Sequence, residues 1–387
     1  MATKTKAPGA EPSATKIKFD AVKLQEIMNI TGAASRGGKA LFPVLPYITL
    51  KGEGSTLIFE SFGEESGVRY YYALETKTPQ KALSVPSREL RDLSSRMEGT
   101  VVFDAGSEDM LHIESGNAKY HLRALSPEEV SEFPYEEETP KFEMEFEARE
   151  LKRHLQKTVF TTGAERDVEY ARGVLLHELP GTFRLVSTDG FRLAMIEKPG
   201  SYKEEQKFIL DGEGIRNLAR ILPDGDAKIE LIIGEKYALF RFPDFQYFVP
   251  LLNTTFPDYE TILGRESPSS YTFERIEFMA ALNRITTLTR HQSKAYIAIF
   301  NFTKNGLVID AESDTLGRGQ ESLKGKLDGE EKKLALNTKF VLDYITNIDD
   351  EALVLKFKDS ASVCHFLPVT STESRYYLMP VKHPTVE

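Results

Sequence analysis

The stretch FEARELKRHL, residues 146–155, returns in outline at two other places in this chain of 387 residues. FDAVKLQEIM begins at Phe19 and FERIEFMAAL begins at Phe273, so the three stretches start 127 residues apart. Each has Phe, then Leu or Phe after four intervening residues, then Met or Leu after three more. A period of this length is too long for a solenoid and matches the usual size of a domain, which predicts three homologous domains.

Two further landmarks follow these stretches in the same order. The first is an apolar residue with others five and eight positions later, in VPSRELRDL from Val85, LDGEGIRNL from Leu210 and LNTKFVLDY from Leu336. The second is a tyrosine with aliphatic residues two and five positions later, in YHLRAL from Tyr120, YFVPLL from Tyr247 and YYLMPV from Tyr376. Three landmarks in one order make coincidence a poor explanation of the repeat.

Each third alternates helical spacing of apolar residues with segments rich in Val, Ile, Phe and Tyr. Hairpins are predicted at equivalent places, over residues 47–61, 173–189 and 297–312. The pattern predicts an α+β fold in which each domain packs two helices against antiparallel sheets. The polar stretches EFPYEEETPKF and TTFPDYETILGRESP contain proline and suit linkers. The predicted domains are therefore residues 17–140, 141–268 and 269–387, after a flexible tail at residues 1–16.

The composition is that of a globular protein outside the membrane, since no run of 18 apolar residues and no apolar signal segment is present. A single cysteine, Cys364, leaves no internal disulfide framework and fits a reducing cytoplasm. The net charge of −10 argues against a surface that is basic throughout. The six predicted helices together carry +4 and the remaining chain −14, which would make a helix-lined side mildly basic. Lys and Arg are also good helix formers, so charge alone leaves both readings open.

Over residues 17 to 383 the chain resembles the β sliding clamps, the processivity subunits of bacterial DNA polymerase III. The resemblance rests on the triple repeat, on STDGFRLA at residues 187–194, on FPDY at 256–259 and on YYLMPVKH at 376–383. It implies a head-to-tail homodimeric ring with helices lining a central hole and no catalytic residues of its own. The implied partners are double-stranded DNA, the replicative polymerase, the clamp loader, and clients such as repair polymerases, mismatch repair proteins and ligase.

The resemblance also implies a hydrophobic groove that accepts short peptides from these clients. Three residues depart from the usual pattern: Phe191 replaces a His, Thr261 an Arg and Ala171 a Leu. Residues after Lys382 extend past the usual end, and this tail would either cover part of the groove or lie free. Mapped by position, the groove would consist of Ala171, Thr188, Gly190, Phe191, Arg192, Leu193, Pro257, Thr261, Ile262, Asn337, Phe340, Met379, Pro380 and Val381.

Two other surfaces follow from the same resemblance. Lys39, Arg88, Arg166 and Tyr170 fall at positions where the family contacts DNA, whereas LDGEG at residues 210–214 stands where basic residues are frequent. Contact with DNA from the domain that carries this segment is therefore in doubt. Ring closure is expected where Tyr120 and Leu122 of one copy meet Leu288 of the other.

Two rival functions are considered. TGAASRGGKAL from Thr31 has Gly38 where a phosphate loop needs Lys, and the following FPVLPYITL is strand-like, which argues against a nucleotide-hydrolysing enzyme. The seven histidines have no metal-ligand spacing along the sequence, so no metal and no cofactor is predicted. The second rival is a non-catalytic peptide-binding scaffold that does not act on DNA.

Overall fold

The computed structural model describes residues 16–34, 47–76, 78, 82–107, 109–163, 168–265, 267–289 and 296–386. The chain divides into two compact units, one with the bounds 1–149 and 220–250 and the other with the bounds 150–219 and 251–387. The middle third of the sequence contributes to both units. Within the described ranges, no helix is long and apolar enough to cross a membrane.

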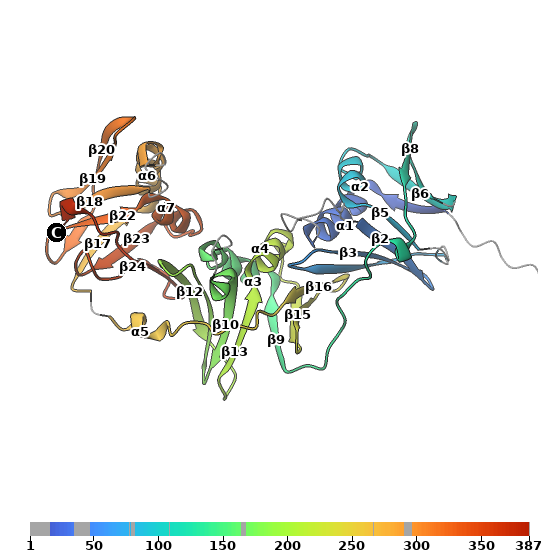
Figure 1. Cartoon of the computed structure of the whole chain (residues 1–387), viewed down its shortest axis with the longest axis horizontal. Helices are drawn as coiled ribbons and strands as arrows, with labels where there is room; N and C mark the ends of the chain where they lie inside the picture. Colours follow the sequence, from blue (N-terminus) through green and yellow to red (C-terminus); the bar gives the residue numbers. More distant parts are fainter. Residues whose placement is uncertain are drawn as a thin grey trace, which may run out of the picture. The chain divides into compact units, whose positions relative to one another are not determined.

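The first unit contains two antiparallel sheets. The larger has the strand order β5-β2-β3-β4-β16-β15-β14-β9 and the smaller has the order β1-β6-β7-β8. Helices α1 and α2 pack against each other (Figure 1). The elements are β1 Lys16–Asp20, α1 Ala21–Ala34, β2 Tyr47–Glu53, β3 Thr56–Phe62, β4 Gly67–Ala73, β5 Leu83–Pro86, α2 Ser87–Ser94, β6 Thr100–Ser107, β7 Met110–Ser115, β8 Ala118–Arg123, β9 Phe142–Glu147, β14 Lys228–Ile233, β15 Tyr237–Arg241 and β16 Phe245–Pro250.

The second unit is built in the same way. Its larger sheet has the order β13-β10-β11-β12-β25-β24-β23-β17-β21 and its smaller sheet the order β20-β19-β18-β22. Helices α6 and α7 pack together in it. Its strands are β10 Gly173–Leu179, β11 Thr182–Thr188, β12 Arg192–Pro199, β13 Gln206–Asp211, β17 Ser269–Glu274, β18 Ile297–Thr303, β19 Gly306–Ser313, β20 Gly317–Leu323, β21 Lys326–Asp328, β22 Lys332–Asn337, β23 Ala352–Phe357, β24 Cys364–Pro368 and β25 Ser374–Leu378.

Helices α3 Ala148–Gln156 and α4 Gly212–Ile221 come from the middle third, and α5 Glu260–Leu263, α6 Arg275–Thr289 and α7 Thr338–Thr346 follow. Single-turn 3-10 helices occur at Pro127–Glu129, Val159–Thr161, Glu169–Arg172 and Pro384–Val386. All six helices expected from the sequence are present, and α5 is an additional turn inside the second predicted linker. The three predicted hairpins are β2–β3, β10–β11 and β18–β19.

The repeated residues have the same local role in each third. Phe19, Phe146 and Phe273 are each the penultimate residue of a strand that leads directly into a helix, and all three are buried. Val85, Leu210 and Leu336 hold the same place before α2, α4 and α7. A strand that ends on a buried side chain and turns at once into a helix fixes where the helix packs.

Polar residues at the strand ends start several of these helices. The carboxylate Oδ1 of Asp20 accepts from the backbone N–H of Val22 at 2.9 Å, and Oδ1 of Asp211 accepts from that of Gly214 at 2.9 Å. The side-chain Oδ1 of Asn337 accepts from the N–H of Phe340 at 3.1 Å. Each bond satisfies a donor that the first turn of a helix leaves unpaired, which defines the start of the helix.

Two strand pairs connect successive thirds of the sequence, and we call them the inter-repeat joints. In the first, β16 pairs with β4 through four residue pairs, from Phe245 opposite Tyr70 to Phe248 opposite Gly67. In the second, β25 pairs with β12 through five, from Arg192 opposite Leu378 to Ile196 opposite Ser374. In both joints the last strand of one third adds to the hairpin of the preceding third, so each large sheet is continuous.

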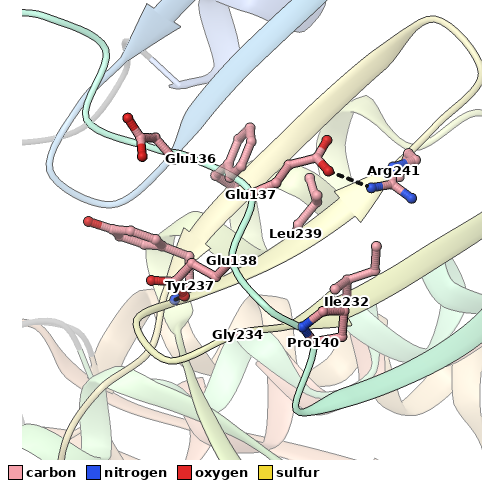
Figure 2. Close-up of a pocket in the computed structure, with 10 residues that line it drawn as sticks. Glu136, Glu137, Glu138, Pro140, Ile232, Gly234, Tyr237, Leu239 and Arg241 are labelled. Atoms are coloured by element: carbon pink, nitrogen blue, oxygen red, sulfur yellow. Dashed lines mark hydrogen bonds and ion pairs between the residues drawn. The ribbon is translucent and has the colours of Figure 1, made fainter.

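The first predicted linker is packed onto the first unit. Tyr135 is buried and contacts Phe248 with ring centroids 5.6 Å apart, and Glu137 pairs with Arg241 at 3.0 Å. Glu138 accepts from the backbone N–H of Lys236 at 2.8 Å. Figure 2 shows that Glu136, Glu137, Glu138 and Pro140 of this segment line a pocket together with strand residues that include Ile232 and Leu239.

Candidate functional site

The hairpin turn between β11 and β12 is held by its own side chains. The hydroxyl of Thr188 donates to the carbonyl of Arg192 at 2.7 Å and accepts from the N–H of Gly190 at 3.0 Å. The carboxylate Oδ1 of Asp189 accepts from the N–H of Phe191 at 2.9 Å. Gly190 has φ of +86°, a conformation that favours glycine. The turn is thus fixed, and it leaves Phe191 49% exposed at its tip.

Arg192 links the middle third to the last third. Its Nε donates to Asp189 at 3.1 Å, its Nη1 to Asp343 of α7 at 2.7 Å, and its guanidinium lies 4.1 Å from the ring centre of Phe340. Burial opposes the charged form, but Tyr376, Asp343 and Asp189 outweigh it and raise the pKa of Arg192. A buried, doubly paired guanidinium of this kind fixes the geometry of the elements that carry its partners.

The end of β25 lies beside this turn. The N–H of Met379 donates to the carbonyl of Phe191 at 2.9 Å, and the N–H of Val381 donates to the carbonyl of Ala335 in β22 at 2.8 Å. Met379 is 38% exposed and Pro380 and Val381 are half-buried. Phe191 and Met379 are therefore two large, exposed apolar side chains whose backbones are hydrogen-bonded to each other.

A buried apolar cluster lies under the same strand. Leu193 packs in it with residues of β10, β11 and β13, and Ile262 of α5 packs against it from outside. Leu193 itself is 4% exposed. Leu193 is thus largely covered by its neighbours, and its place in the groove stays a prediction.

The segment that carries Ile262 is anchored by Tyr259. The hydroxyl of Tyr259 lies 2.6 Å from Nδ1 of His177, and Arg184 donates to Glu260 at 2.6 Å. Burial raises the pKa of Tyr259 to about 12 and lowers the pKa of His177, so both are neutral at pH 7. This polar anchor holds α5 against the face of β10 and β11.

The remaining predicted groove residues are placed as follows. Asn337 and Phe340 belong to the start of α7 beside Arg192, while Pro257 and Thr261 are exposed at the start of α5. Ala171 is buried in the 3-10 helix at Glu169–Arg172. The structure therefore brings Phe191, Arg192, Phe340 and Met379 together.

The expected DNA contacts are less completely placed. Arg88 of α2 has a side chain that is 77% exposed and lies 3.8 Å from Asp92. Tyr170 is half-buried and lies 6.1 Å, between ring centres, from Phe256. Lys39 and Arg166 lie outside the described residues.

The residues expected at the dimer seam lie on or against the terminal strands of the two small sheets. Tyr120 and Leu122 belong to β8, where Tyr120 is 39% exposed. Leu288 of α6 lies against β20, since a Cβ added at Gly319 would meet its Cδ1 at 2.6 Å.

Several residues that organise the site were not singled out from the sequence. Asp343 and Phe160 hold Arg192, the latter through its carbonyl at 3.2 Å. Tyr259 belongs to the FPDY motif but had no predicted role of its own, and no pattern in the sequence pointed to His177 or Arg184. Tyr259 lies more than 70 residues from His177 and from Arg184, and Asp343 lies 151 residues from Arg192. No local pattern in the sequence can therefore predict these pairs.

The model of the DNA polymerase III β subunit central domain matches residues 145–258, and that of its C-terminal domain matches residues 260–382. Together these matches span well over half of the chain. The chain belongs to the DNA polymerase III β-subunit family.

Individual relatives extend the likeness of this β-subunit family member over nearly the whole chain. The β sliding clamp of Pseudomonas aeruginosa is 26% identical over 365 residues, which are 93% of this chain and 97% of the relative. The structure of the Thermotoga maritima β subunit has a TM-score of 0.85 at 20% identity and covers 95% of this chain and 99% of that one. A Pseudomonas aeruginosa sliding clamp solved with bound griselimycin has a TM-score of 0.84 at 22% identity, with the same coverage.

The α+β fold expected from the sequence is confirmed by these neighbours. Over the part of the chain that is described, no group of three or more His, Cys, Asp or Glu side chains is arranged to hold a metal ion.

Proposed function

We propose that this protein is a DNA sliding clamp, a non-catalytic subunit that encircles duplex DNA and tethers the replicative polymerase. Membership of the β-subunit family supports this function, because its named relatives are β sliding clamps. A DNA clamp in a bacterium acts in the cytoplasm, where we expect this protein.

The observation that carries the proposal is the pair of unmatched strand edges. In each inter-repeat joint, the last strand of one repeat pairs with the strand that follows the hairpin of the preceding repeat. These pairs are β16 with β4 and β25 with β12. The last strand of the first repeat is β8, and the strand that follows the hairpin of the last repeat is β20. In the described sheets, each of these strands is terminal. A head-to-tail pair of chains would satisfy both edges twice, which closes a ring of three repeats per chain.

The side chains at these edges suit such a seam. Tyr120 and Leu122 lie opposite Ile113 and Leu111 of β7, on the face of the small sheet that is buried elsewhere. On the other edge, Leu288 covers the inner face of β20 at Gly319. We propose that these three residues, Tyr120, Leu122 and Leu288, form the apolar part of the dimer interface, with the predicted domains 17–140, 141–268 and 269–387 as its repeats.

We propose that DNA is held by weak, sequence-independent contacts with the helices. Arg88 is the described residue that best fits this role, because its side chain is 77% exposed and its Nε lies 3.8 Å from Asp92, a long distance for an ion pair. Contact with DNA stays a prediction for Lys39, Arg166 and Tyr170. Non-specific contacts of this kind correspond to a dissociation constant of roughly 10⁻⁴ to 10⁻⁶ M at physiological salt.

We propose that the surface formed by Phe191, Arg192, Phe340 and Met379 is the peptide-binding groove for polymerases, the clamp loader and repair clients. An aromatic ring and a thioether on a rigid support suit the apolar anchors of a short peptide. Leu193 and Ile262 would support the groove from below, and Pro257, Thr261, Pro380 and Val381 would border it.

Retention on DNA tests the function directly. A clamp loaded onto nicked circular DNA should stay bound through a high-salt gel filtration and should leave when the circle is cut to a linear form. Release from both forms at the same rate would favour the non-DNA scaffold. Arg88→Ala should weaken direct binding to all sequences alike, whereas Lys358→Ala, which removes a cation outside the helices, should not.

A further inference from the structure

A pair of histidines lies across the β7–β8 hairpin. His112 of β7 and His121 of β8 are directly opposite each other in the antiparallel register. Their rings stand at 80° with centroids 4.5 Å apart, and their Nδ1 atoms face each other in close contact. Both side chains lie on the face opposite the buried Leu111 and Ile113, which leaves them accessible to solvent.

We infer that this pair is a binding site for a divalent transition-metal ion such as Zn²⁺, Cu²⁺ or Ni²⁺. Two facing imidazole nitrogens can share a proton or jointly ligate a metal, since a neutral imidazole offers one lone pair. A tetrahedral ion with bonds of about 2.0–2.1 Å needs the two nitrogens roughly 3.3 Å apart. Exposed rings on neighbouring strands reach that separation by a small rotation about their side-chain bonds.

Two carboxylates flank the pair on the same face. Asp104 of β6 lies opposite His112 in the register, and Glu114 is two residues farther along β7. They pair with Lys16 at 3.8 Å and with Lys119 at 3.2 Å respectively, at partly exposed positions where such pairs are weak. A bound dication would therefore lie near two carboxylates whose charge Lys16 and Lys119 offset only in part.

The ligand atoms of the site decide which metal ions it prefers. Only two side chains provide nitrogen, and the described residues offer no third ligand in place, so water would fill the remaining positions. Imidazole nitrogen favours Cu²⁺, Ni²⁺ and Zn²⁺, whereas Mg²⁺ and Ca²⁺ prefer oxygen. The site is thus open and exchangeable, and it ties β8 to β7 on the face opposite Tyr120. It is independent of the proposed ring, because both histidines belong to one chain.

Metal titration of the full chain, purified without a histidine tag, tests this inference. We expect one Cu²⁺ per chain by calorimetry and an electron paramagnetic resonance spectrum with two nitrogen ligands. His112→Gln and His121→Gln should each weaken binding by at least about tenfold and reduce the nitrogen count to one. The matched control is His383→Gln, which removes a histidine near the chain end and should change neither result.

The melting temperature of each metal-free variant verifies that it folds, as expected for surface positions. Wild-type affinity in both His112→Gln and His121→Gln would overturn the site, as would an unchanged two-nitrogen spectrum. Equal weakening in His383→Gln would do the same, because it would show binding without a defined location.

Discussion

The last strand of each third begins alike but ends up in different surroundings. Tyr120, Tyr247 and Tyr376 are each the third residue of their strand, in β8, β16 and β25. Tyr247 and Tyr376 lie at the inter-repeat joints and are fully buried, whereas Tyr120 on the terminal strand β8 is 39% exposed. The same residue type is therefore core or surface according to whether a neighbouring hairpin supplies the next strand.

The two kinds of strand differ in their neighbours' chemistry as well. On β8 the positions around Tyr120 carry exposed Lys119, His121 and Arg123, and charged side chains on a terminal strand discourage indiscriminate pairing. On β25 the one cation in the paired stretch, Arg375, is bonded to Glu197 of β12 at 2.8 Å. The open edge is thus protected until a matching strand arrives, while the closed joint is locked by specific pairs.

Truncating the three tyrosines should separate the two kinds of strand most clearly. Tyr247→Ala and Tyr376→Ala each leave a cavity in a sheet core and should lower the free energy of unfolding by about 3–5 kcal/mol. Tyr120→Ala should change it by less than about 1 kcal/mol under monomeric conditions and should weaken dimerisation instead. Urea unfolding and sedimentation on the same samples measure both effects, and equal destabilisation by all three would remove the distinction.

A charge at the opposite edge should break the proposed seam. Leu288→Asp places a carboxylate against β20, where it would be desolvated without a partner if a second chain docks there, so the dimer should dissociate. Val369→Asp, at a 53% exposed apolar residue outside the edges, is the control and should stay dimeric. Sedimentation velocity at low micromolar concentration gives the answer, and a dimeric Leu288→Asp would place the seam elsewhere.

The groove depends on the second joint. Truncating a groove side chain should have a smaller effect than the changes above, and the effect should be on peptide affinity. Met379→Ala removes an exposed side chain and should reduce the affinity for a polymerase-derived clamp-binding peptide by roughly 1–3 kcal/mol. Leu193→Ala should reduce it similarly but also destabilise the fold, because Leu193 is buried in the underlying cluster. The control is Leu316→Ala, which truncates an exposed residue just before β20 and should leave the peptide affinity measured by calorimetry unchanged. Unchanged affinity in Met379→Ala contradicts the assignment.

A buried histidine near the same joint should give a modest dependence on pH. Burial lowers the pKa of His154 in α3 to about 4, and its Nε2 lies 4.0 Å from Glu373, too far for a hydrogen bond. The unfolded chain therefore binds the proton first, so stability is complete above about pH 6.5 and declines as the pH falls toward 4.

His154→Gln should flatten this decline by roughly 1–2 kcal/mol between pH 7 and 4.5, as measured by urea unfolding at a series of pH values. His383→Gln is the control and should follow the wild type. A steeper decline in His154→Gln would mean that the folded protein holds this ring protonated.

The sequence predicted the elements better than their connections. The three helices expected to begin at Phe19, Phe146 and Phe273 are present, but each begins two residues later, because these phenylalanines end a strand as buried residues. The partners of Arg192 could not be predicted from the sequence. Asp343 is 151 residues from Arg192, and the two meet only because β12 pairs with β25. Leu193 lies in the buried cluster under the turn, and its predicted place in the groove wall stays a prediction. The sequence could not show this burial, because alternation along a strand separates two faces without telling which one is covered.

The continuity of the two large sheets bears on how the protein can be divided. A fragment cut at the predicted repeat boundaries would strip β16 from β4 or β25 from β12 and expose a full ladder of backbone donors and acceptors. The compact units already reflect this, since their borders run through the middle third and not between thirds. The smallest piece that could be excised and still fold is therefore larger than one repeat, and a single repeat expressed alone should aggregate through its bare strands.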